Sequence, residues 1–285
     1  MKVTVWGCRG SIPVPGHHTL RYGGNSTCLE VRSEDGRVYV IDAGSGIRNL
    51  GQALLNESDV SDIRFFFTHA HWDHLVGFPF FAPAYSVRYN FTFCSGPHAE
   101  SSVRKYMTRQ MQAPYFPIDF SELKAGFNFR CENPTMEDGN CRIGSMECRA
   151  YPLSHPNGGY GYRFVEQGKT FVFLTDNELS FVHEGGLTKE QYTEICRGAD
   201  LLLHDAQYTT DEYRYREGWG HSTYREAVQL ALEAGVQRLG FFHHDPDRSD
   251  DDLDRQVGLC RQEIAHAGAA VECFACFEGM VLDLS

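Results

Sequence analysis

The segment 68–74 constrains this chain more than any other part of its sequence. It follows the apolar run 63–67, whose β-forming residues predict a buried strand. Within six residues it contains three histidines and an aspartate: His69, His71, Asp73 and His74. Imidazole nitrogens and a carboxylate oxygen suit Zn²⁺, and also Mn²⁺ or Fe²⁺. We therefore predict a metal site where this strand ends, with a histidine-rich surface turn as the alternative.

Four further apolar runs also end in histidine or aspartate. Glu147–Leu153 leads to His155, Thr170–Leu174 to Asp176, Ala199–Leu203 to His204 and Asp205, and Arg238–Phe242 to His243 and His244. Strand ends that share one edge of an α/β sheet lie close together and collect ligands. We therefore expect these side chains to join the first motif, with His244 the weaker candidate because the apolar run ends at His243.

Asp42 ends another predicted strand, 38–41, which pairs with 26–31 through a hairpin at Asp35-Gly36. A carboxylate at such a position is a plausible hydrogen-bond partner for a metal-bound histidine. Helix capping is the alternative role. The glycine- and proline-rich loop 7–16 either brings backbone close to a ligand or is a plain connector. His17 and His18 extend this loop and are further candidates to line the cleft.

The composition sets broader limits. The chain has 285 residues, 42% of them hydrophobic, and a net charge of −12. The acidic balance argues against a broad, non-specific grip on nucleic acid, because phosphate binding is driven by lysine and arginine. No apolar segment approaches membrane-spanning length and no export signal precedes the first strand, so we expect a cytoplasmic protein without membrane contact. Its ten cysteines, including Cys273 and Cys276, are then expected to be reduced and mostly buried.

With these residues assembled, the chain resembles the metallo-β-lactamase-fold hydrolases over essentially its whole length. The resemblance implies an α/β fold, a four-layer αβ/βα sandwich forming one domain, 1–285, in two halves of about 1–150 and 151–285. It also implies a two-metal cleft, with divalent Zn most favoured and Mn or Fe as alternatives. By this analogy His69, His71 and His155 hold one metal, Asp73, His74 and His243 hold the other, and Asp176 bridges the two.

Two further segments resemble the ribonuclease Z branch of that superfamily. These are His204-Asp205-Ala206 and His221-Ser222-Thr223, the latter opening a predicted helix at 222–234. In that branch the acidic residue orients a histidine that protonates the leaving oxygen, a role an imidazolium can fill in phosphodiester cleavage. Carried over, His221, Asp205 and Asp73 are the predicted catalytic residues. A helix-capping or surface role is the alternative for His221.

The chain departs from ribonuclease Z in lacking a long basic arm. Its opening loop, the turn 22–25, and the segments 78–81 and 243–246 are instead similar to a compact bacterial or phage branch that includes cyclic-nucleotide phosphodiesterases, among them enzymes that defeat Pycsar immunity. This resemblance implies hydrolysis of 3′,5′-cyclic nucleotides to nucleoside monophosphates by a metal-bridged hydroxide. It also implies a small phosphodiester substrate, no large nucleic acid and a homodimer.

Other functions are compatible with the same sequence. They are ribonuclease Z-like processing of small RNA ends, thioester or lactam hydrolysis, and a non-catalytic metal-binding protein. The proline-bounded aromatic segments around Phe80 and Tyr115 either stack a nucleobase beside the metals or form core and subunit contacts. Weak strand signals extend over 121–150, with a turn at Asp138-Gly139-Asn140.

Overall fold

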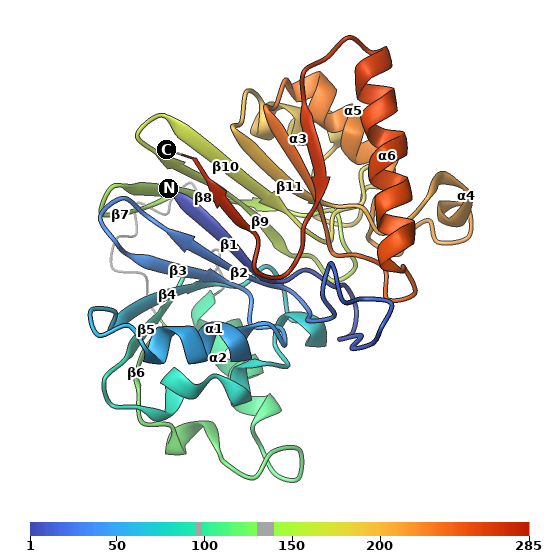
Figure 1. The fold of residues 1–285 in the computed structure, drawn as a ribbon. Helices are drawn as coiled ribbons and strands as arrows, with labels where there is room; N and C mark the ends of the chain where they lie inside the picture. Colours follow the sequence, from blue (N-terminus) through green and yellow to red (C-terminus); the bar gives the residue numbers. More distant parts are fainter. Residues whose placement is uncertain (95–98, 130–139, 285) are drawn as a thin grey trace.

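A computed structural model of the chain describes residues 1–94, 99–129 and 140–284. Two seven-stranded mixed sheets face each other (Figure 1). The first sheet has the order β14 (Val281–Asp283), β1 (Lys2–Gly7), β2 (Cys28–Arg32), β3 (Val38–Ile41), β4 (Asp62–Phe66), β5 (Asn90–Phe93) and β6 (Gly126–Asn128). The second has the order β13 (Glu272–Ala275), β12 (Arg238–Phe242), β11 (Leu201–Asp205), β10 (Lys169–Leu174), β9 (Tyr160–Glu166), β8 (Met146–Pro152) and β7 (Asn140–Ile143).

Helices cover the outer face of each sheet. The α-helices are α1 (Ile47–Leu55), α2 (Ala99–Gln110), α3 (Lys189–Cys196), α4 (Thr210–Tyr213), α5 (Tyr224–Ala234) and α6 (Asp250–His266), and short 3₁₀ turns are η1 (Trp72–His74), η2 (Phe78–Phe80), η3 (Ala82–Tyr85) and η4 (Phe120–Glu122). One apolar cluster joins α1 and α2 to the first sheet, and another joins α3, α5 and α6 to the second. The predicted four-layer αβ/βα sandwich in one domain is therefore confirmed.

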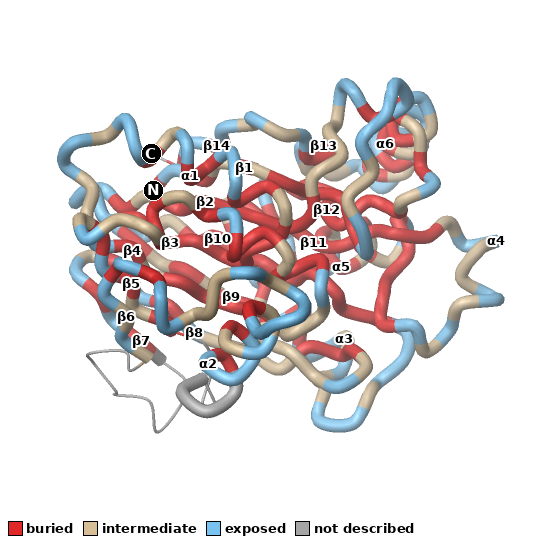
Figure 2. The backbone as a smooth tube through the Cα atoms, turned by 90° about the horizontal axis from the view of Figure 1, so that it is seen from below, coloured by how far each residue is buried: buried red, intermediate tan, exposed pale blue. Residues whose placement is uncertain are grey.

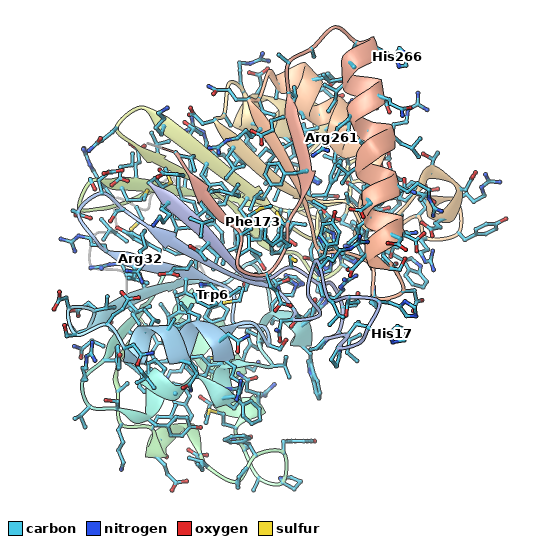
Figure 3. All side chains as sticks on the ribbon, viewed as in Figure 1. Trp6, His17, Arg32, Phe173, Arg261 and His266 are labelled. Carbon is cyan, nitrogen blue, oxygen red and sulfur yellow. The ribbon has the colours of Figure 1, made fainter. Side chains whose placement is uncertain are left out.

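The central core lies between the two sheets. Residues from both, such as Val31 and Phe173, are fully buried there, and Phe173 can be followed in Figure 3. In Figure 2 the strands are the most continuously buried part of the backbone, while α4 and the outer loops are exposed. Burial of apolar surface contributes roughly 25 cal/mol per Å² to stability, so this interface between the sheets stabilises the fold together with the two clusters under the helices.

Local sequence signals explain where the elements begin and end. Helix α5 starts after Thr223, whose side chain and that of Glu226 form a capping box, and it ends at Gly235 in the left-handed conformation. The predicted β2–β3 hairpin is confirmed. Strands β6, β7 and β8 account for part of the weak strand signal in 121–150, whereas Asp138 and Gly139 lie outside the described residues.

The sheet topology directs several strand ends to one edge. Strands β3, β4 and β5 are parallel in the first sheet, and β10, β11 and β12 are parallel in the second. Parallel strands place their carboxyl ends on the same side. Three residues that follow these ends have a positive φ although they are not glycine: Asp42 (60°), Asp176 (56°) and His243 (55°). Such backbone is costly and concentrates at functional sites.

Two further observations concern the cysteines near the C-terminus and the helices. Cys273 lies in β13, and both it and Cys276 are buried in the core rather than gathered with other potential ligands. None of the potential metal-binding groups found among the described residues contains a cysteine. None of the helices in the described ranges combines the length and apolar composition needed to cross a bilayer.

Candidate metal centre

The seven side chains predicted as metal ligands lie together at the edge where the strands end. Two groups of potential ligand atoms, each within 4.8 Å of one another, divide them as follows: His69, His71, His155 and Asp176 in the first group, and Asp73, His74 and His243 in the second. A third group combines Asp176 and His243 with His221. The ligands come from both halves of the chain, so the fold alone assembles the cluster.

Asp176 lies between the two groups. Its Oδ1 is 3.7 Å from Nε2 of His69 and 3.8 Å from Nε2 of His155, both in the first group. The same carboxylate approaches the second group, with 3.3 Å between Oδ2 and Nε2 of His74 and 3.3 Å between Oδ1 and Nε2 of His243. This contact with both groups is the geometry expected of a bridging carboxylate.

Hydrogen bonds at Nδ1 fix the orientation of four of these histidine rings. The Nδ1 partners are Thr68 Oγ1 for His69 (3.1 Å), Asp42 Oδ2 for His74 (2.7 Å), the Gly220 carbonyl for His155 (2.9 Å) and Gln207 Oε1 for His243 (3.2 Å). An occupied Nδ1 leaves Nε2 to face the cluster, as is usual for metal-ligating histidines. The ring of His71 has the opposite orientation: its Nδ1 faces the cluster, 3.2 Å from Nε2 of His155.

Asp42 is fully buried behind the second group. Besides His74, its carboxylate accepts the backbone N–H of Thr68 at 2.8 Å and the Thr68 hydroxyl at 2.7 Å. The alternative role as a helix cap does not hold, because α1 starts after Gly46 and has no side-chain cap. Asp42 therefore holds both the ring of His74 and the start of the histidine motif.

The glycine-rich loop 7–16 also reaches the cluster. The backbone N–H of Ser11, which has φ of 63°, donates to Asp73 Oδ2 at 2.9 Å. A Cβ added at Gly10 would come within 2.4 Å of Nδ1 of His243, so only glycine fits there. Buried Arg9 anchors the loop by donating to the carbonyls of Gly23, Asp245 and Arg248.

Burial and charge act in opposite directions within the cluster. Burial lowers the pKa of His69 well below its ordinary value and lowers that of His155 to about 4. Burial alone would also lower the pKa of His74, but the carboxylates of Asp73 and Asp176 raise it well above the ordinary value. Histidine binds a metal only in its neutral form. Because burial lowers the pKa values of His69 and His155, it favours this neutral form at both residues.

The donor set fits divalent metal ions. Nε2 of His69 and Nε2 of His74 are buried without a hydrogen-bond partner, and both face the cluster. A buried polar atom without a partner is costly, and a metal ion would remove that cost. Neutral imidazoles and carboxylates without any thiolate match the ligands that zinc, manganese and iron accept.

His221 lies beside the metal-binding groups rather than on the surface. It is 8% exposed, and its ring stacks on that of His243 with 4.9 Å between centroids. Its Nδ1 is 3.4 Å from Asp205 Oδ2 but makes no hydrogen bond. The Asp205 carboxylate instead accepts the N–H groups of Asn177 and Ser222, each at 3.0 Å. Since Thr223 caps α5, the helix-capping alternative for His221 is wrong.

Burial shapes the protonation of this second pair as well. It lowers the pKa of His221 to about 4 and raises the pKa of Asp205 to about 7. Because Asp205 makes no hydrogen bond to the His221 ring, it fixes His221 mainly by accepting the N–H of the neighbouring Ser222, while its carboxylate faces the ring.

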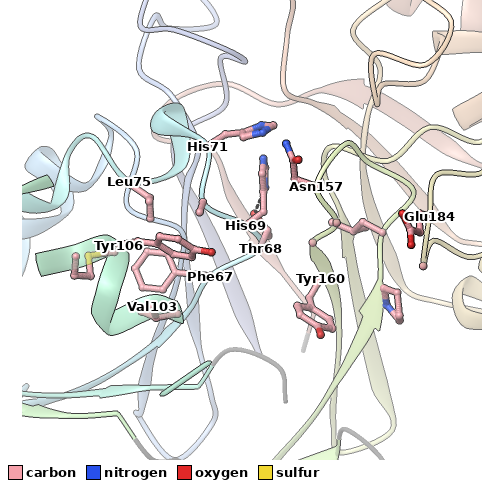
Figure 4. Close-up of a pocket in the computed structure, with 17 residues that line it drawn as sticks. Phe67, Thr68, His69, His71, Leu75, Val103, Tyr106, Asn157, Tyr160 and Glu184 are labelled. Atoms are coloured by element: carbon pink, nitrogen blue, oxygen red, sulfur yellow. Dashed lines mark hydrogen bonds between the residues drawn. The ribbon is translucent and has the colours of Figure 1, made fainter. Parts of the chain in front are cut away.

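A cleft of about 610 Å³ opens next to His69 and His71. Figure 4 shows Val103 and Tyr106 of α2 on one side and Tyr160 and Glu184 on the other, with the two histidines between them. The described residues that line this cleft include no lysine or arginine. It thus offers neutral hydrogen-bonding groups, one carboxylate and apolar walls.

A second hollow of about 530 Å³ shares Ala70, Leu75 and Tyr106 with the first. Aromatic residues dominate its rim, and we call Trp72, Phe80, Tyr115 and Phe116 the aromatic patch. Trp72 is 80% exposed and Tyr115 78%. Phe80, Tyr115 and Phe116 belong to the proline-bounded aromatic segments that the sequence singled out, whereas Trp72 belongs to the histidine motif; Tyr115 and Trp72 are surface residues rather than core.

Not every candidate reaches the centre. His17 and His18 are exposed and lie by the start of α6 with Asp250 and Asp251, so they do not line the cleft. His17 is labelled at the outer edge of the molecule in Figure 3. His244 donates from Nε2 to the carbonyl of Cys276, away from the cluster. The sequence analysis did not identify Thr68, Gln207 and Gly220 as hydrogen-bond partners of the clustered histidines. Such partners form no recognisable motif, and the only available signal was that Thr68 directly precedes His69.

Comparison with known proteins agrees with this architecture. A family model described as a beta-lactamase superfamily domain matches residues 37–244, which include every residue of the cluster. The chain is 24% identical to a ribonuclease Z of Brevibacillus brevis over 77% of its own length and 79% of the relative's.

Solved structures have the same fold across the whole chain. The metallo-β-lactamase fold protein YhfI from Bacillus subtilis has a TM-score of 0.68 at 17% identity and covers 99% of this chain and 98% of its own. A diphosphatase from the PhnP family has a TM-score of 0.66 at 18% identity and covers 100% and 98%. The chain therefore belongs to the beta-lactamase superfamily, with the metallo-β-lactamase fold and ribonuclease Z-like relatives.

Proposed function

We propose that this protein is a metal-dependent phosphodiesterase that hydrolyses 3′,5′-cyclic nucleotides to nucleoside monophosphates. The observation that carries the proposal is the cleft beside the candidate metal centre, which places side chains suited to divalent metal ions next to walls free of lysine and arginine among the described residues. A metal site can hold one phosphodiester anion through its own charge. Longer nucleic acid needs lysine and arginine along its backbone.

The proposed ligands are the seven cluster residues. His69, His71 and His155 would hold one metal, Asp73, His74 and His243 the other, and Asp176 would bridge the two. Zinc suits this set best, with manganese or iron as alternatives. When bound, such metals supply Lewis-acid chemistry: they make water nucleophilic near neutral pH and neutralise charge on phosphoryl oxygens.

The residues of this chain would complete the reaction. Asp205 holds the backbone of Ser222 and faces Nδ1 of His221, which leaves Nε2 of His221 to carry the proton. In the proposed mechanism that proton passes to the ribose oxygen as it leaves phosphorus. The negative phosphate of a bound substrate would act against the burial that lowers the pKa of His221 to about 4. Asp73 would keep its place through the Ser11 N–H.

Product chromatography tests the proposal. Metal-loaded protein is incubated with 3′,5′-cAMP, cGMP, cCMP and cUMP, beside a sample treated with EDTA. We expect nucleoside monophosphate only in the metal-loaded samples. If none of the four yields product while the metals are verified in place, the cyclic-nucleotide assignment is wrong.

A second candidate function follows from relatives such as the ribonuclease Z of Brevibacillus brevis. Processing of short RNA ends uses the same bond cleavage and the same proposed residues. A short RNA with a 3′ extension is therefore added to the assay. Faster, metal-dependent trimming of this RNA than of any cyclic nucleotide would favour the second candidate.

We also propose that the protein is a homodimer and that a second copy covers the aromatic patch. Exposed apolar patches often mark protein–protein interaction sites. Trp72 stands between two cluster residues, His71 and Asp73, so a partner seated there would lie next to the cleft.

A further inference from the structure

Glu178 is a buried carboxylate that lies two residues beyond Asp176 and is 1% exposed. Each of its oxygens accepts two hydrogen bonds. The donors are Tyr213 Oη (2.6 Å) and the Gly218 N–H (2.7 Å) on Oε1, and the Gly220 N–H (2.7 Å) and His183 Nε2 (2.8 Å) on Oε2. A buried charge is tolerated only when its hydrogen-bonding capacity is satisfied in this way. With all four hydrogen bonds formed, the Glu178 carboxylate connects segments that lie far apart in the sequence.

The hydrogen bond to Gly220 leads directly to the metal-binding cluster. Gly220 has φ of 92°, and its carbonyl accepts Nδ1 of His155 at 2.9 Å. A Cβ on Gly220 would lie 2.1 Å from that nitrogen, so the chain passes against the ring. Glu178 therefore fixes the residue whose carbonyl orients His155. The next residue along the chain is His221, which this anchor also positions.

The segment that carries Glu178 holds the backbone beside His155 as well. The N–H of Glu178 donates to the carbonyl of Ser154 at 2.8 Å, and the N–H of His183 donates to the Ser154 hydroxyl at 3.0 Å. The same segment continues to Glu184, which lines the cleft (Figure 4). One wall of the cleft and the ring of His155 are thus attached to a single carboxylate.

We propose that Glu178 is a positioning residue for His155, and through Gly220 for His221, and that it links the cleft wall at Glu184 to the metal centre. The inference rests on the proposed function in one respect, that His155 is a metal ligand. Loss of a partner behind a ligating histidine typically weakens metal binding about 10–100-fold. We expect an effect of this size at the first group.

The test replaces the carboxylate without changing its size. In Glu178→Gln one oxygen becomes an NH₂ group, so a backbone N–H of Gly218 or Gly220 loses its acceptor. Cobalt(II) is titrated into metal-free protein, and both its affinity and its visible absorption, which reports ligand geometry, are recorded. We expect affinity to fall about 10–100-fold at the weakened site with an altered spectrum.

Glu166→Gln is the matched control. Glu166 is 2% exposed and accepts the N–H of Glu34, yet it lies at the opposite end of β9 from Tyr160, about 20 Å away at about 3.3 Å per residue. Removing this carboxylate should lower the melting temperature and leave cobalt affinity and spectrum unchanged. If Glu178→Gln does not fold, Tyr213→Phe removes one of the four hydrogen bonds from a partly exposed helix, and a several-fold loss of affinity is expected.

The outcomes separate the two proposals. If Glu178→Gln, or in its place Tyr213→Phe, binds cobalt with the affinity and spectrum of wild type, the positioning role is wrong. If wild-type protein binds cobalt but cleaves no cyclic nucleotide, the proposed substrate fails while the titration still decides the role of Glu178. If wild-type protein binds no divalent metal, both proposals are overturned.

Discussion

Replacing Asp42 with asparagine tests how the structure holds the second metal-binding group. Asp42 is buried, and its Oδ1 accepts the Thr68 N–H at 2.8 Å. Its Oδ2 accepts the Thr68 hydroxyl and Nδ1 of His74, both at 2.7 Å. An asparagine that keeps the N–H bond turns its NH₂ group toward the other two. The hydroxyl can rotate to accept, but the His74 N–H loses its charged acceptor and keeps only the Thr68 hydroxyl, 3.2 Å away.

The expected magnitude follows from that single loss. One hydrogen bond to a charged acceptor contributes about 1.5–3 kcal/mol. Since about 1.4 kcal/mol corresponds to a tenfold change in affinity, binding at the group that contains His74 should weaken roughly 10–100-fold. Measured losses of partners behind metal ligands cover the same range of about 10–100-fold. Binding at the group that contains His155 should change much less.

Competition titration with a chromogenic chelator measures both dissociation constants for zinc. Asp62→Asn is the control, because Asp62 is an exposed aspartate at the start of β4, away from the end that carries the histidine motif. Melting curves verify that each variant is folded. If Asp42→Asn and Asp62→Asn both bind two zinc ions as tightly as wild type, the role assigned to Asp42 is refuted.

Further predictions concern the acid, the loop and the patch. His221→Ala should lower turnover of the best cyclic nucleotide roughly 10²–10⁴-fold without changing the metal content, as measured by steady-state kinetics and metal analysis. Wild-type activity in this variant would contradict the proposed role of His221 as the general acid. Gly10→Ala forces a Cβ to 2.4 Å from His243, so it should weaken metal binding and cost about 1–3 kcal/mol of stability, whereas Gly16→Ala, which meets nothing within 4 Å, should do neither. Tyr115→Glu should convert a dimer to a monomer in light scattering, and an unchanged mass would argue against the proposed interface.

The family resemblance predicted the fold, and the pattern of residues at strand ends predicted which side chains would meet. A short histidine motif after one apolar run, and polar residues after four others, indicate which strand ends must meet. Side chains at strand ends need only the topology to bring them together, and here β10, β11 and β12 run parallel. Asp42 could also be predicted as a partner, because a carboxylate follows its strand directly.

The remaining contacts depend on loops whose conformation has no periodic signal. The Ser11 N–H and the Gly220 carbonyl are backbone groups, which any residue carries. Glu178 lies in an irregular segment, and its four donors are spread over positions 183–220. His17 and His18 had the right chemistry for the cleft but extend outward, because the loop turns at Gly10 and Ser11 before it reaches them. Residue type alone does not specify such paths.

The most direct test of the account is anomalous diffraction from crystals grown with zinc. We predict two peaks per chain, about 3.5–4 Å apart as in known two-metal sites, one beside His69, His71 and His155 and the other beside His74 and His243, with the Asp176 carboxylate between them. A single ion, or ions bound away from Asp176 with these histidines unliganded, would contradict the two-metal centre on which the proposed reaction depends.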